Sequence, residues 1–198
     1  MTTQDQTAMG WGRFAAMIAV STVIMFGLTY QLVYSAGHAT FSLTRLVSAL
    51  VMGCVMTAVM LGFMWKMYRP TAAKALVLVI AIGLGGALLM LNRSQALVGD
   101  MEFMGAMIPH HSIAINNARK ADLRDPRVRY LADRITRDQV KEIEEMKRLM
   151  ADIRANGRQA DTRLAAGPAR LTPAGEREAE ALDRKSTRLN SSHVPISY

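Results

Sequence analysis

The sequence predicts an all-α protein built from three transmembrane helices and an external pair of helices. Three observations support this fold class. The first half of the 198-residue chain contains three long apolar runs. Residues 101–120 then repeat apolar side chains with the period of an α-helix, and a second amphipathic pattern begins after the pair Asp125-Pro126. We therefore expect a membrane anchor followed by a smaller helical domain.

The three apolar runs cover residues 14–34, 46–67 and 75–91. A helix needs roughly 20 apolar residues to cross the hydrocarbon layer, with a range of about 17 to 25, so the third run is short but sufficient. Its Gly83, Gly85 and Gly86 indicate close packing of transmembrane helices rather than a phosphate loop. Two more runs follow the first, which favours a retained anchor over a cleaved signal peptide.

Basic residues predict the orientation of this anchor in a lipid bilayer. The second connection carries Arg69 and Lys74, with Lys66 at its edge, whereas the first connection carries only Arg45. The positive-inside rule then places the N-terminus and the basic loop in the cytoplasm. Everything after residue 92 is expected in the periplasm, with the anchor in a bacterial inner membrane.

Charge and cysteine usage exclude some classes of function. The formal net charge is +8, but the basic residues between 119 and 148 alternate with acidic ones. This alternation is typical of a solvated helix surface, so nucleic acid is not an expected partner. Cys54 is the one cysteine and lies inside the second run, which excludes a disulfide framework and a thiolate metal site.

The helix predicted at residues 101–120 places soft metal donors on one face. At about 100° per residue, Met104, Met107 and His111 share an apolar stripe with Ala114, Ile115 and Ala118. His110 lies at the edge of the stripe, because adjacent residues on a helix point in different directions. The two imidazoles are therefore expected to have different roles.

The opposite face of this helix is expected to be polar. It contains Glu102, Gly105, Pro109, Ser112, Asn116, Arg119 and Lys120. Pro109 removes the backbone donor that would pair with the carbonyl of Gly105. On a polar face, water would satisfy that carbonyl, so the helix is expected to continue through the proline.

The second amphipathic helix begins with an N-cap at Asp125 and proline at the first helical position. Its apolar stripe consists of Val128, Leu131, Ala132, Ile135, Met146, Leu149, Met150 and Ile153, with Gln139 and Glu142 in the middle. A polar residue at a core position indicates a function, and a buried carboxylate needs a partner or a cation. Glu142 is therefore predicted to belong to a site.

An antiparallel hairpin of these helices, turning near Leu123, would bring their unusual residues to one level. Register counting places Met104 opposite Glu142, Met107 opposite Gln139, and His111 near Ile135 and Gln139, with an uncertainty of about one turn. The candidate metal ligands are Met104, Met107, His110, His111, Gln139, Glu142 and Met146. Thioethers select Cu(I), while imidazole suits copper and several other metals. We expect a site for Cu(I), with Ag(I) as its mimic.

These residues also resemble a known family. The pattern comprises Asp100, Phe103, Met104, Met107-Ile108-Pro109-His110-His111, Ala114-Ile115, Leu131-Ala132, Ile135, Gln139, Glu142-Ile143 and Met146. It resembles the bacterial domain-of-unknown-function family 305 over residues 93–154, in a membrane-anchored form. The resemblance implies a ferritin-like helical bundle and, for some periplasmic relatives, copper binding or copper resistance. One copy supplies two helices, so self-association is expected to complete a four-helix bundle, with copper-handling proteins as further partners.

The expected domains are an N-terminal tail (1–13), the membrane anchor (14–91), the external domain (92–155), a flexible tail (156–184) and a segment resembling translated adapter sequence (185–198). Met52, Met56, Met60 and Met64 form a row in the second run that favours packing over a copper pathway. His38 is expected to be a solvent-exposed residue without a role.

Two other classes of function compete with metal binding. A metal-dependent enzyme is disfavoured, because neither His110 nor His111 follows a glutamate by three residues, as a ferritin-like di-iron site requires. A membrane scaffold or regulatory subunit without metal stays open. In that case Glu142 would need a structural partner such as Arg134 or Arg137 from a neighbouring chain.

Overall fold

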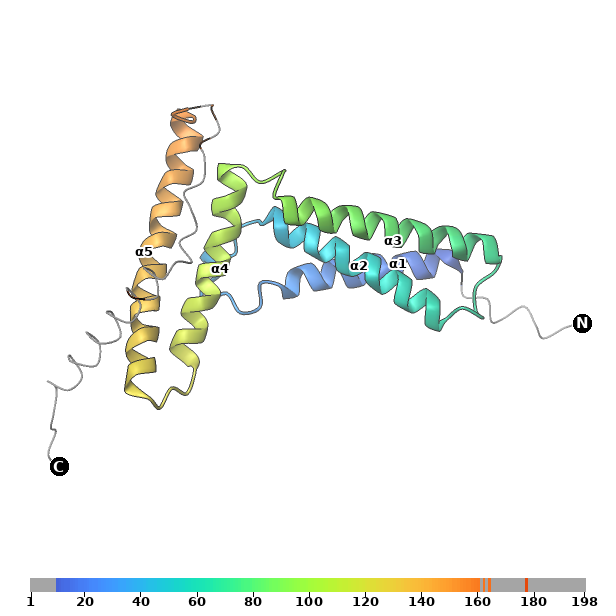
Figure 1. The fold of residues 1–198 in the computed structure, drawn as a ribbon, viewed down its shortest axis with the longest axis horizontal. Helices are drawn as coiled ribbons and strands as arrows, with labels where there is room; N and C mark the ends of the chain where they lie inside the picture. The colour runs from blue at the N-terminus through green and yellow to red at the C-terminus, as the bar shows by residue number, and fades with distance from the viewer. Residues whose placement is uncertain (1–9, 161, 163, 165–176, 178–198) are drawn as a thin grey trace, which may run out of the picture. The chain divides into compact units, whose positions relative to one another are not determined.

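The computed structural model describes residues 10–160, 162, 164 and 177, and every regular element in this part of the chain is helical. The elements are α1 (Trp11–Leu28), the short 3-10 helix η1 (Ala36–His38), α2 (Leu43–Phe63), α3 (Thr71–Ser94), α4 (Asp100–Lys120) and α5 (Pro126–Asn156) (Figure 1). The predicted all-α class is confirmed. The chain divides into two compact units between His110 and His111, within α4. Most of the predicted tail segments lie outside the described residues.

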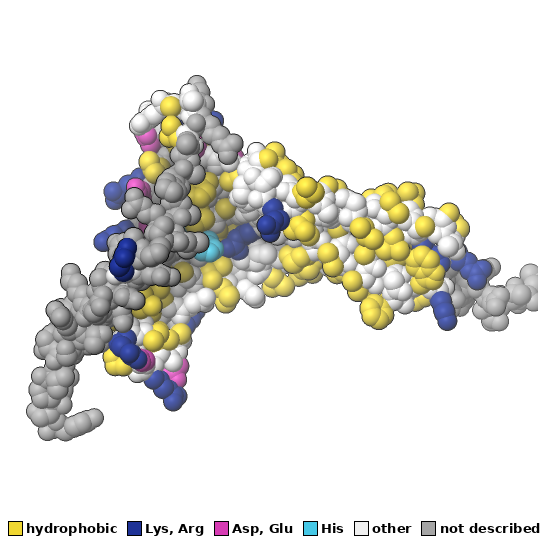
Figure 2. Space-filling model, in the orientation of Figure 1, with side chains coloured by type: hydrophobic (Ala, Val, Ile, Leu, Met, Phe, Trp, Pro, Cys, Tyr) yellow, Lys and Arg dark blue, Asp and Glu magenta, His cyan; other side chains and the backbone are white. Residues whose placement is uncertain are grey.

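Helices α1, α2 and α3 are each long and apolar enough to cross a membrane, with lengths of 18, 21 and 24 residues. Apolar side chains cover the length of this bundle, and lysine and arginine gather near its ends (Figure 2). The helix ends differ from the predicted runs by several residues. The first helix, α1, already ends at Leu28, whereas α3 continues beyond the third apolar run at both ends into polar residues. Each predicted run otherwise corresponds to a helix that could cross a membrane.

Within the first unit, α2 packs against both α1 and α3, and successive helices run in opposite directions (Figure 1). Gly85 lies at the contact between α2 and α3, since a Cβ atom added there would be 3.1 Å from Cβ of Cys54. This agrees with the predicted close packing. Cβ atoms added to Gly83 and Gly86 would meet nothing within 4 Å among the described residues. The close-packing prediction was therefore wrong for these two glycines, which lie on other faces of α3.

Aromatic and basic residues gather where the chain passes from α2 to α3. The buried core at this end consists of Phe14, Leu61 and Tyr68. The indole N–H of Trp11 donates to the carbonyl of Arg69 at 3.1 Å. The Lys74 ammonium donates to the carbonyl of Trp65 at 2.9 Å and lies 4.3 Å from the centre of its ring. Amphipathic aromatic rings beside basic groups are typical of a membrane interface.

The first half of α4 is fixed to the segment between η1 and α2. The Thr40 hydroxyl donates to the carbonyl of Gly105 at 2.7 Å, and a Cβ atom on Gly105 would lie 2.8 Å from the carbonyl oxygen of Phe41. Gly105 is therefore a point of close backbone approach. The prediction that water satisfies its carbonyl was wrong, because Thr40 supplies the donor that Pro109 lacks.

The start of α5 matches the predicted cap. The Asp125 carboxylate accepts a hydrogen bond from the backbone N–H of Arg127 at 2.8 Å, and Pro126 occupies the first helical position. The side-chain hydrogen bond from Arg127, followed by its backbone hydrogen bond, lowers the pKa of Asp125 to about 2. At the other end, Gly157 has a φ of 79° and its N–H donates to the carbonyl of Ile153. A residue with positive φ at this position is typical of a helix C-terminus.

Candidate functional site

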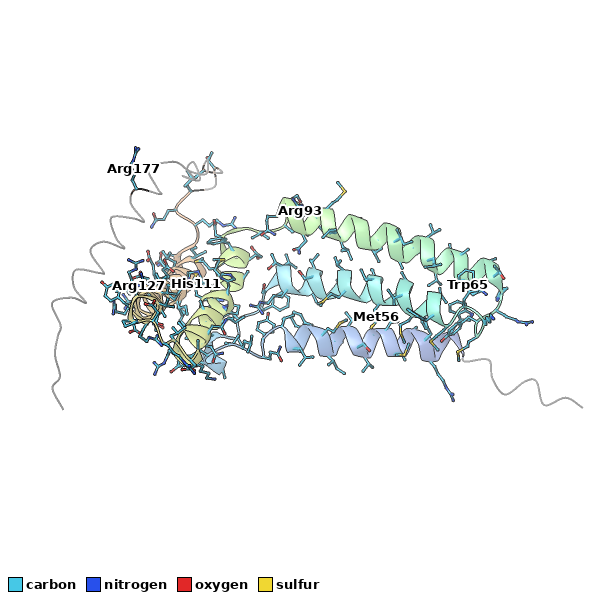
Figure 3. The ribbon with its side chains drawn as sticks, turned by 60° about the horizontal axis from the view of Figure 1, so that its bottom comes forward. Met56, Trp65, Arg93, His111, Arg127 and Arg177 are labelled. Atoms are coloured by element: carbon cyan, nitrogen blue, oxygen red, sulfur yellow. The ribbon has the colours of Figure 1, made fainter. Side chains whose placement is uncertain are left out.

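The second unit brings three of the predicted site residues together. Nδ1 of His111 on α4 lies 3.0 Å from Oε2 of Glu142 on α5. The Gln139 side-chain amide donates to the same carboxylate oxygen at 3.3 Å. The contact partner of His111 is thus one turn beyond Gln139, within the uncertainty of the predicted register. Figure 3 labels His111 on its helix.

Glu142 is less buried than the sequence predicted. Its side chain is 50% exposed, whereas that of His111 is only 12% exposed. The buried row of α5 is formed by Ala132, Ile143, Met146 and Met150. At about 100° per residue this row is centred some 60° or more from Glu142 on the helix. The apolar stripe of α5 is wide, and Glu142 lies on its solvent side rather than in its buried centre.

The geometry of this pair restricts the chemistry of His111. Nδ1 and Oε2 are within ion-pair distance, but the angles of the contact are not those of a hydrogen bond. With a small rotation of either side chain, the carboxylate would favour the tautomer that carries its proton on Nδ1. Nε2 is then the nitrogen with the lone pair for a metal ion. Metal-binding histidines are commonly oriented in this way, with a carboxylate holding the nitrogen that does not bind the metal. The pair His111–Glu142 therefore fits an imidazole ligand and its orienting group.

The other candidates are distributed over different environments. Met104 and Met146 are buried, with 6% and 9% of their surface exposed, and Met107 is partly buried. His110 is exposed, in contrast to His111. Among the described residues, no group of three His, Cys, Asp or Glu side chains is placed to hold a metal ion. A metal site in this unit would therefore need thioether, amide or additional imidazole donors.

The face of α4 that was expected to be solvated is largely buried. Gly105, Pro109, Ser112 and Asn116 all lie in buried positions. The sequence already indicated that the Gly105 carbonyl needs another donor, because Pro109 lies four residues later. The identity of the substitute donor, Thr40, depends on the tertiary fold. His38 also differs from its prediction, because it is partly buried.

Comparison with known proteins identifies the family. A domain described as a domain of unknown function (DUF305) matches residues 91–191, just over half of the chain. The chain belongs to the DUF305 family. The DUF305 match begins one residue before the predicted external domain and continues past its predicted end at 155 into the segment 185–198. The interpretation of that last segment as non-native stays a prediction.

A curated relative of the DUF305 chain is an uncharacterized protein of Acanthamoeba polyphaga mimivirus. The two sequences are 40% identical over 60 residues, which correspond to 29% of this chain and 40% of the viral protein. The chain thus spans well under two thirds of that relative. No solved structure matches the chain. The comparisons assign a family and leave its activity open.

Proposed function

We propose that this DUF305 protein is a membrane-anchored protein whose external helical domain binds Cu(I), with Ag(I) as a mimic, in copper homeostasis or resistance. The contact between His111 Nδ1 and Glu142 Oε2 is the observation that carries the proposal. It supports the proposal, because metal-binding histidines commonly have a carboxylate beside the ring nitrogen that does not bind the metal. In this proposal the protein binds metal and has no enzymatic activity.

The donor set favours a soft ion. Cys54 is the chain's one cysteine, and it belongs to the apolar helix α2. Met107 precedes His111 by one helical turn on α4, a spacing at which two side chains are neighbours on a helix. Thioethers prefer Cu(I), which imidazole also accepts. Met104, one turn earlier, and His110 are the remaining donors that α4 could supply.

Two contacts support an antiparallel hairpin of α4 and α5 as the frame of this site. One is the His111–Glu142 contact. The other is the hydrogen bond from the Arg129 guanidinium to the carbonyl of Ala118, at 2.8 Å. Both join α4 to α5 on the C-terminal side of His110, and both follow the antiparallel order. We propose this hairpin, in place of a lone helix, as the metal-binding element.

Titration of the full chain in detergent with a Cu(I) probe competitor tests the proposal. Replacing Met104 and Met107 together with leucine keeps the side-chain volumes nearly constant. We expect Cu(I) affinity to fall by about tenfold or more, because altering even a group that only orients a metal ligand typically costs that much. The matched control replaces Met67 and Met150 with leucine and should bind as the unaltered chain does. Unchanged Cu(I) affinity in the first variant would favour a scaffold or regulatory subunit without metal.

We further propose that the anchor lies in a bacterial inner membrane with its N-terminus in the cytoplasm and the DUF305 domain in the periplasm. Arg13, Lys66, Arg69 and Lys74 lie at or near one end of the three-helix bundle. Arg45 and Arg93 lie at its other end, and Figure 3 labels Arg93 near the C-terminal end of α3 and Trp65 in the connection before its N-terminal end. The end with more basic residues is expected to face the cytoplasm.

A further inference from the structure

Helix α5 has a second apolar strip that is not buried. The side chains of Val128, Leu131, Ile135 and Leu149 are 46%, 43%, 37% and 46% exposed. At about 100° per residue these four residues lie within about 60° of one another. They lie beside the buried row of α5, three in the first third of the helix and Leu149 near its end, with Glu142 between them. Apolar side chains exposed along one side of a helix are typical of a surface that another helix covers.

Four charged residues flank this strip in a self-complementary order. Along α5 the order is Arg134, Asp138, Lys141 and Glu145. In the described part of the chain, none of these four side chains makes an ion pair or hydrogen bond. Arg134 and Glu145 lie equally far from the peptide bond after Gln139, and the same is true of Asp138 and Lys141. In an antiparallel pair of α5 helices, each basic residue of this set would therefore face an acidic residue of the other helix.

We propose that a second copy of this chain docks along the exposed strip of α5, antiparallel to it, with the two-fold axis near the peptide bond after Gln139. Arg134 then faces Glu145 of the second copy, and Asp138 faces Lys141 of the second copy. The symmetry repeats both pairs, because a two-fold interface brings the same surface of each copy together. Toward the ends of the interface, Leu131 lies against Leu149 of the second copy.

The same docking brings the candidate sites of both copies to one place. Glu142 lies within the exposed strip and contacts His111 of its own chain. With the axis after Gln139, the two Glu142 residues are separated by about 8 Å along the helix direction at 1.5 Å per residue. An ion at the axis could take donors from both His111–Glu142 pairs. This last step rests on the proposed metal binding, whereas the docking of α5 on α5 does not.

A pair of charge variants of the full chain in detergent tests the docking. The acidic variant carries Arg134→Glu and Lys141→Glu, and the basic variant carries Asp138→Lys and Glu145→Lys. Each variant alone places four pairs of like charges across the interface. We expect self-association measured by sedimentation to weaken by about tenfold or more, because like charges opposed at an interface are repelled. A mixture of the two variants restores all four pairs, so it should form dimers about as stable as those of the unaltered chain.

A matched control replaces Lys147 and Arg154 with glutamate and should leave self-association unchanged, because at about 100° per residue both lie some 80° or more from every residue of the strip and of the charged row. A monomeric unaltered chain would overturn the proposal, and so would a mixture that associates no better than its parts.

The direction of docking is tested by disulfide formation in a Cys54→Ser background. Gln139→Cys should cross-link between copies, whereas Leu131→Cys should not, since its two copies lie about 25 Å apart along the axis. Equal cross-linking at both positions would indicate parallel docking and overturn the antiparallel arrangement.

The outcome is separable from that of the metal titration. The four charged residues are not candidate ligands, so sedimentation of the metal-free protein measures docking alone. Failure of docking with intact Cu(I) binding would leave the proposed function standing with a site in one copy. Successful docking without Cu(I) binding would leave the interface standing and remove the shared ion.

Discussion

Thr40, Gly105 and Pro109 show how one proline in a helix is compensated. Pro109 has no backbone N–H, so the carbonyl of Gly105 has no intrahelical donor. The Thr40 hydroxyl takes this place at 2.7 Å, and the absence of a side chain at Gly105 lets the backbone at Phe41 approach. The three residues thereby fix the first half of α4 to the segment that precedes α2.

Thr40→Val tests this compensation, since valine has a similar shape and no hydroxyl. We expect the free energy of unfolding to fall by about 1 kcal/mol, because a partly buried carbonyl loses its partner. In a Pro109→Ala background the alanine N–H can donate to the same carbonyl, so the effect of Thr40→Val should shrink toward zero. Chemical denaturation of the four proteins in detergent measures the coupling. Equal effects of Thr40→Val in both backgrounds would contradict this account.

Glu142 is the residue whose role the candidate site most depends on. Glu142→Gln retains the shape of the side chain and removes its charge. We expect Cu(I) affinity to fall roughly 10- to 100-fold, which is typical when the outer-shell partner of a metal-binding histidine is altered. The apo protein should change by less than about 1 kcal/mol, because a half-exposed pair contributes little to stability. Titration and thermal melts measure the two effects. Loss of apo stability with unchanged Cu(I) affinity would make Glu142 a structural residue.

At the scale of elements, the sequence was most informative where the signal is local. The three apolar runs and the Asp125-Pro126 start of α5 follow from composition and cap chemistry, and the structure contains all of them. The faces of α4 and α5 were less predictable. Ser112 and Asn116 are buried despite their polarity, and Glu142 lies beside the buried row of α5 instead of within it. The periodicity of a sequence shows which face of a helix is apolar. It does not show which part of a broad apolar face other helices will cover, because that depends on tertiary contacts.

The glycines of α3 allow a matched test of helix packing. Gly85→Val should destabilise the bundle by about 1–3 kcal/mol, because its Cβ would already be 3.1 Å from Cβ of Cys54 and the added methyl groups overpack the contact. Gly83→Val makes the same change in helix propensity, but a Cβ atom at Gly83 would have no described atom within 4 Å, so this variant should be tolerated. Thermal unfolding in detergent compares the two variants. An equal loss of stability would remove the distinction between these faces.

At the scale of the whole molecule, the distribution of basic residues is the basis of the orientation that we propose for the DUF305 domain. Four basic residues, Arg13, Lys66, Arg69 and Lys74, lie at or near one end of the bundle, and two, Arg45 and Arg93, lie at the other. The difference follows from the sequence, and the helices place these residues at opposite ends of the spans. The DUF305 domain would lie in the periplasm if the end of the bundle with more basic residues stays in the cytoplasm when the helices insert into the membrane.

Labelling with a membrane-impermeant maleimide tests the orientation in intact cells, and the single cysteine of the chain makes the experiment clean. In a Cys54→Ser background, Ala121→Cys should react in intact cells, and Met67→Cys should react only after the inner membrane is permeabilised. Replacing Lys66 and Arg69 with glutamine leaves two basic residues at each end, so we expect both positions to become partly labelled as the orientation turns mixed. The carbonyl of Arg69 that accepts from Trp11 is retained in that variant, which separates the loss of charge from loss of the contact. Labelling of residue 67 alone in intact cells would place the DUF305 domain in the cytoplasm and invert the proposed topology.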